Sequence, residues 1–132
     1  MISFLTENII YKVYSIYESI YLKQKSTSSN ENHFEETDIL ISVHYGDPNS
    51  AIFLYSGKHI IISGCGLSIY DIDKKKEIHI LAEPDNIWWT NGLHQDDLDD
   101  VNTEFRFVST FKENETRVYK MNISTMKISI VL

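Results

Sequence analysis

The sequence predicts an α+β fold, in which antiparallel β-meanders carry a helix at the N-terminus. Composition favours sheet, because Ile occurs 19 times and Ala only twice, and β-branched side chains suit a pleated surface. Apolar and polar residues alternate with period two from residue 38 onward. A different, helical spacing of apolar residues occupies the first 23 positions. The length of 132 residues fits one domain, residues 1–132.

The N-terminal segment, residues 1–23, is predicted to be a helix. Its apolar residues are spaced 4, 4, 3 and 4 apart, which places them on one helical face: Leu5, Ile9, Val13, Ile16 and Ile20. A strand is the alternative, since residues 10–20 also alternate loosely. Twenty unbroken residues are long for a single strand, so the helix is the preferred interpretation.

The polar stretch of residues 24–37 predicts a surface loop. A first β-meander is expected over residues 38–82, with strands at Ile39–Tyr45, Ala51–Tyr55, His59–Ser63, Leu67–Ile72 and Glu77–Leu81. Three consecutive isoleucines in the third of these strands predict a central strand that is covered on both faces. An acidic loop region follows at 83–103. A C-terminal β-meander is expected over 104–132, with a turn at 112–115.

Negative charge is concentrated in one stretch. Residues 77–104 carry eight carboxylates and no Lys or Arg, whereas the rest of the chain has 12 basic and 11 acidic residues, or +1. The net charge of -7 argues against a general nucleic-acid binder, which needs a basic face. Uncharged stretches are too short to span a bilayer, no signal peptide is apparent, and the single cysteine allows no internal disulfide. A cytoplasmic protein is expected.

The acidic region is predicted to bind a partner protein. Clustered carboxylates steer a basic partner, and tryptophan is enriched at binding hot spots. The alternatives are that the tryptophans belong to the core and that the aspartates form a solvated loop. The candidate contact residues are Glu83, Asp85, Trp88, Trp89, Asp96, Asp97, Asp99, Asp100 and Glu104.

No cofactor, metal or catalytic site is expected. The aspartate run lacks the register and the glycine of a calcium loop, and the five histidines show no metal-ligand spacing. Cys65 lies between two glycines but precedes a predicted strand instead of a helix, so it is interpreted as a small buried residue at a bend.

In general character the chain resembles the immunity proteins of bacterial polymorphic toxin systems, including contact-dependent growth inhibition. The features that carry the resemblance are the meander Ser56–Leu81, the Trp88–Trp89 pair and the acidic run Asp96–Asp100 in a short, acidic chain without catalytic motifs. No aligned motif is shared, so no family residue is carried over.

The resemblance implies a cognate toxin domain as partner, often a basic nuclease, with no nucleic acid or membrane bound directly. A nuclease presents a positive cleft for phosphates, which an acidic surface can cover. Two alternatives stay open. One is an assembly subunit that pairs through sheet edges. The other is a small hydrolase with a site built from His79, His94 and the aspartate run.

Overall fold

The computed structural model describes residues 1–110 and 115–131, and these are almost entirely β-strand. They form three four-stranded antiparallel sheets, each a meander of consecutive strands, and one short hairpin. Sheet A contains β1 Ile2–Glu7, β2 Tyr11–Ile16, β3 Ser19–Gln24 and β4 Ile39–Val43. Sheet B contains β5 Ser50–Phe53, β6 His59–Gly64, β7 Gly66–Asp71 and β8 Lys76–Ile80. Sheet C contains β11 Trp89–His94, β12 Glu104–Thr110, β13 Thr116–Asn122 and β14 Lys127–Ile130.

The predicted N-terminal helix over 1–23 is wrong, and with it the α+β class. Three strands, β1 to β3, occupy this segment, and the described helical structure is a single 3-10 turn, η1 Lys25–Thr27. Two turns interrupt the apparent helical face. Asn8 accepts hydrogen bonds from the backbone N–H groups of Ile10 and Tyr11, and Tyr17 adopts φ 53. Ile9, which the helix would bury, is 94% exposed in the first of these turns.

The fourth strand of sheet A comes from the segment that was predicted to start the first meander. β4 pairs with β3, and the next strand, β5, pairs with β6 in sheet B. The polar loop after β3 therefore connects two neighbouring strands of one sheet. A register shift between the Ile20 and Tyr21 pairs interrupts the simple alternation of β4.

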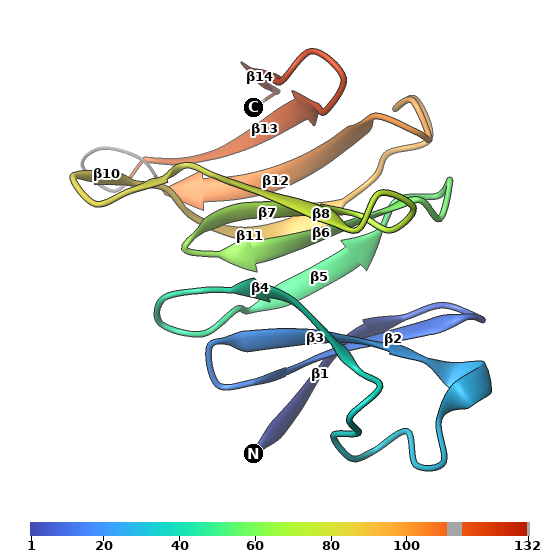
Figure 1. The fold of residues 1–132 in the computed structure, drawn as a ribbon. Coiled ribbons are helices and arrows are strands. Elements are labelled where there is room, and N and C mark those ends of the chain that lie inside the picture. The colour runs from blue at the N-terminus through green and yellow to red at the C-terminus, as the bar shows by residue number, and fades with distance from the viewer. Residues whose placement is uncertain (111–114, 132) are drawn as a thin grey trace.

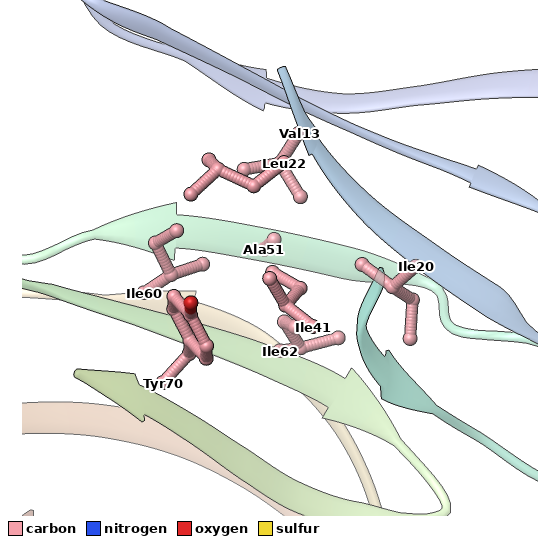
Figure 2. Packing of buried hydrophobic residues seen from close by; sticks show 8 residues of the cluster. All are labelled: Val13, Ile20, Leu22, Ile41, Ala51, Ile60, Ile62 and Tyr70. Carbon is pink, nitrogen blue, oxygen red and sulfur yellow. The ribbon is translucent and has the colours of Figure 1, made fainter. Parts of the chain in front are cut away.

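Sheet B lies between sheets A and C, as Figure 1 shows. Both of its faces are apolar and contribute to the two cores. Figure 2 shows the first core, where Ile60, Ile62 and Tyr70 of sheet B meet Val13 and the neighbouring apolar side chains of sheet A. In the second core, Ile61 and Leu67 of sheet B pack with Phe105, Phe107 and Met121 of sheet C. The prediction that the triple-isoleucine strand is covered on both faces is confirmed, since Ile60, Ile61 and Ile62 are each 0% exposed.

The acidic region 83–103 is only partly loop. It includes most of the hairpin formed by β9 Ala82–Glu83 and β10 Asn86–Ile87, and all of β11, which forms the first strand of sheet C. The C-terminal strands β12 to β14 form the expected meander. Most of the predicted turn at 112–115 and the final residue lie outside the described residues.

Candidate interaction surface

The predicted contact residues lie at two opposite ends of the sheets. β11 runs from Trp89 to His94 and separates them. Glu83, Asp85 and Trp89 lie at the end with the β9–β10 hairpin, on the left in Figure 1. The aspartate run and Glu104 follow the other end of β11, on the right. The acidic region therefore forms two groups of carboxylates, one at each end of β11.

Trp88 belongs to the core and Trp89 to the surface. The Trp88 ring lies 5.0 Å from the ring of Tyr119 and packs against the core between sheets B and C. Trp89 is 47% exposed. Adjacent residues of an extended chain point in opposite directions, which explains this difference. Core packing therefore holds for Trp88, whereas Trp89 lies on the surface and its contact with a partner stays a prediction.

The aspartate run mostly stabilises its own loop. Asp99 is buried, and its carboxylate accepts hydrogen bonds from Arg106 Nε at 3.2 Å and from the backbone N–H of Asp96 at 2.9 Å. Burial raises the pKa of Asp99, but the hydrogen bonds from Arg106 and from the Asp96 backbone, together with the charges of Arg106 and Lys120, outweigh burial and leave the pKa below its ordinary value. Asp96 and Asp100 accept bonds from the backbone N–H groups two residues ahead, which is typical of Asx turns.

Glu104 also has a structural role. Its carboxylate accepts the backbone N–H of Asp100 at 2.8 Å and lies 3.6 Å from Lys120 Nζ. Asp97 and Asp100 remain exposed. This end of the molecule thus offers a partner few unpaired carboxylates, because Asp96, Asp99 and Glu104 are engaged with Arg106, Lys120 and the loop backbone.

The opposite end presents three exposed aromatic side chains, two that follow strands of sheet A and one in sheet C, and we call it the aromatic end. Tyr17 is 67% exposed, Tyr45 69% and Trp89 47%. The rings of Tyr45 and Trp89 lie 6.4 Å apart. Gly46 fits beside Trp89, since a Cβ added there would lie 3.7 Å from the indole ring.

The connection after β4 holds this end together. The backbone N–H of Gly46 donates to Glu18 Oε2 at 2.7 Å, which ties the connection to the β2–β3 turn that carries Tyr17. Tyr17 and the loop residues Asp47 and Pro48 line a small cavity of about 190 Å³. Neither Tyr17 nor Tyr45 was among the predicted contact residues, because an exposed tyrosine in a turn has no signature in a single sequence.

Charge at the aromatic end is negative. Four carboxylates from three turns lie there: Glu18, Asp47, and both Glu83 and Asp85 of the β9–β10 hairpin. Among the described residues of this end, the basic side chain is Arg117, whose Nη2 lies 3.0 Å from a Glu115 carboxylate oxygen. Aromatic surface and unbalanced carboxylates therefore coincide here.

A buried polar cluster lies between sheets A and B below this end. His44 is fully buried, and its Nε2 is 2.8 Å from Ser68 Oγ, which also contacts Ser42 and donates to Glu77. The His44 ring stacks on His79 with centroids 4.5 Å apart. Burial, with the charge of His79, lowers the pKa of His44 to about 4. Ser68 is 0% exposed, so a substrate has no access to this serine–histidine pair.

Residues of the other chemical hypotheses are dispersed. His79 binds the Cys65 carbonyl in sheet B, whereas His94 binds the Gly92 carbonyl in sheet C. Within the described residues, no group of three or more His, Cys, Asp and Glu side chains is arranged to hold a metal ion. Cys65 is buried at the bend between β6 and β7, and burial raises the pKa of its thiol, in agreement with a structural residue.

The comparisons with known proteins return no relative. No protein-family model, no curated protein and no solved structure matches the chain. Across the two described ranges, no helix is long and apolar enough to cross a membrane.

Proposed function

We propose that this chain binds a basic protein partner through its aromatic end, and that it neutralises that partner as an immunity protein neutralises its cognate toxin. The observation that carries the proposal is the coincidence of Tyr17, Tyr45 and Trp89 with four carboxylates at one end of the sheets. Binding hot spots are rich in aromatic side chains, and charges around them steer the approach of an oppositely charged partner.

The aromatic end supports this function better than the aspartate run does. Tyr45 and Trp89 are held by backbone contacts of Gly46 and β11, so little conformational entropy is lost when a partner covers them. Glu83 and Asp85 project from a short hairpin and are exposed. A basic cleft, such as the phosphate-binding cleft of a nuclease, is complementary to this arrangement.

Co-purification provides the test. The tagged protein is co-expressed with the polypeptide that is encoded next to it, and the complex is isolated by size exclusion. We expect a one-to-one complex with a basic domain, and loss of that domain's toxicity. Trp89→Ala and Tyr45→Ala should each weaken binding by about 30-fold, as truncation of a hot spot of about 2 kcal/mol does.

Charge reversal separates the two ends. Glu83→Lys with Asp85→Lys should slow association strongly in low salt, because steering by carboxylates is screened by ions. Asp97→Lys with Asp100→Lys is the matched control at the opposite end and should change the association rate little. A larger effect of the control pair would place the interface on the aspartate run and contradict the proposal.

A further inference from the structure

A pocket opens between sheets A and B, at the end of sheet A away from the aromatic end. Tyr11 begins β2 beside the pocket, whereas Tyr17 follows the other end of that strand. We call it the end pocket, and its volume of about 440 Å³ lies within the range of small-molecule sites. Its walls include Tyr11, Leu22, Ile39, Tyr70, Ile72 and Lys75. The end pocket is therefore separate from the surface proposed to bind a protein partner.

Apolar side chains of the two sheets leave the end pocket unfilled. Ile39 of β4 pairs with Leu22 of β3, so both side chains share the face of sheet A that points toward sheet B. Leu22 is buried in the first core, whereas Ile39 is 43% exposed. Ile72, which follows β7, packs partly buried against the same core. The pocket therefore continues the first core outward and offers an apolar wall to a ligand.

Tyr70 places a hydroxyl without a partner in this pocket. The residue is 4% exposed, and Figure 2 shows its hydroxyl directed from sheet B toward sheet A. Within residues 1–110 and 115–131, no group forms a hydrogen bond with this hydroxyl. Burial, and to a lesser degree the nearby Tyr11 and Asp71 side chains, raises the pKa of Tyr70, so the hydroxyl keeps its proton. Buried hydroxyls almost always have a hydrogen-bond partner, so this one is suited to bind an oxygen of a ligand.

The charge of the end pocket is positive, although the net charge of the chain is -7. Lys75 is exposed at its mouth, and the other described residues that line it are uncharged. No carboxylate of the described residues forms an ion pair with the Lys75 ammonium group. Asp71 lies on the opposite face of β7 from Tyr70, 3.5 Å from His59 Nε2. The mouth of the pocket therefore favours an anion.

We propose that the end pocket binds a small organic carboxylate that has an apolar body and a second oxygen at the far end of that body. The apolar body packs on Leu22, Ile39 and Ile72. The Tyr70 hydroxyl donates to the second oxygen, and Lys75 pairs with the carboxylate at the mouth. Such a ligand removes apolar wall from water and gives the buried hydroxyl a partner. This binding goes beyond the proposed capture of a protein partner and does not depend on it.

Titration of the isotope-labelled full chain, followed by NMR, tests the proposal with two probes. The probes are para-acetylbenzoate and 7-oxooctanoate, and each carries a carboxylate and a ketone at opposite ends of an apolar body. We expect millimolar binding of at least one probe, as is usual for ligands of this size. The amide signals of Leu22, Thr37 and Ile39 should shift, whereas those of Tyr45 and Trp89 at the aromatic end should not.

Matched ligands and variants separate the two polar contacts. Para-isopropylbenzoate has a similar shape but no ketone, and it should bind about 5-fold more weakly than para-acetylbenzoate. Tyr70→Phe should remove this difference and keep the stability of the wild type, because the hydroxyl has no protein partner to lose. Lys75→Met should weaken both benzoates about 3-fold. Lys74→Met, in the same turn but outside the pocket, is the control and should bind both like the wild type.

A pocket-filling variant keeps the test decisive if Tyr70→Phe fails to fold. Ile39→Trp fills the pocket from a partly exposed position and should abolish binding of both probes. Failure of both probes to bind the wild type overturns the proposal, and so does retained binding in Ile39→Trp. A ketone preference that survives in Tyr70→Phe, or wild-type affinity in Lys75→Met, also contradicts it.

Discussion

Sheets A and C use the same device on their outer faces, in different surroundings. In sheet A, Lys23 Nζ lies 2.6 Å from Glu35 and 2.9 Å from Asp38, both in the segment that joins β3 and β4. In sheet C, Arg106 pairs with Asp99 in the segment that joins β11 and β12. In each sheet a cation on a strand therefore holds a long connection against the outer face.

The surroundings decide how much each ion pair matters. The Lys23 side chain is 1% exposed and lies over the Tyr14 ring, whose hydroxyl donates to Asp38. Arg106 is 18% exposed among polar neighbours. Burial lowers the pKa of Lys23, but Glu35 and Asp38 outweigh burial and hold the pKa above its ordinary value. A buried ion pair therefore holds the connection on sheet A, whereas a partly hydrated ion pair holds the connection on sheet C.

Removal of Lys23 should have the largest effect. Lys23→Met leaves Asp38, whose side chain is 1% exposed, without its cation, and an uncompensated buried charge costs about 3–5 kcal/mol. Urea denaturation measures the loss in free energy of unfolding. Lys12→Met is the control, since Lys12 makes an exposed bond to Asn32 and its removal should cost less than about 1 kcal/mol. Equal losses for the two variants would show that the Lys23 cluster does not organise sheet A.

Acid should weaken the boundary between sheets A and B. The pKa of His44 is about 4 in the folded state against 6.5 in the unfolded chain, so the unfolded chain binds more protons between these values. Stability from His44 is fully present above pH 6.5 and is lost as pH falls toward 4, to a total of about 3 kcal/mol. The groups that face His44 are His79 and, through Ser68, Glu77.

Denaturation at a series of pH values measures this dependence. His44→Gln should flatten the profile between pH 6.5 and 4, whereas His33→Gln, at an exposed histidine, should leave it unchanged. Retention of the full slope in His44→Gln would assign the acid sensitivity to other groups.

The ion pair of sheet C should give the smallest loss. Asp99→Asn keeps the shape of the side chain but removes the charge that faces Arg106, and a hydrogen bond to a charged group contributes about 1.5–3 kcal/mol. Partial hydration of Arg106 places the expected loss near the lower value, about 1.5 kcal/mol. Thermal melts of Asp99→Asn and Lys23→Met compare the two losses of stability. A larger loss in Asp99→Asn would contradict the ranking of the two ion pairs.

Local patterns predicted the strands well where burial was regular. The alternation from residue 38 onward identified β4 to β8, and three consecutive isoleucines identified the doubly covered β6. The helix predicted for the first 23 residues was wrong, because Tyr17 and Glu18 form a turn that no Gly, Pro or Asn marks in the sequence. Asn8 was a turn signal that the helical spacing obscured.

The candidate site was predicted only in part. Trp89, Glu83 and Asp85 lie where a partner can reach them, whereas Trp88 and Asp99 are engaged inside the fold. Neighbours in sequence such as Trp88 and Trp89 separate because a strand alternates its faces. Three separate connections reach the same end of the sheets and bring Tyr17, Tyr45 and Trp89 to it. The spacing of these residues along the chain does not predict this.

The sequence by itself determined that this protein is dominated by antiparallel strands and that its excess negative charge lies between residues 77 and 104. Both properties are local, since side-chain alternation and charge are read residue by residue. The tertiary structure decided which end each carboxylate occupies and which cation it meets. Those properties depend on the pairing of strands far apart in the chain, because packing three sheets face to face determines which side chains lose water and which keep it.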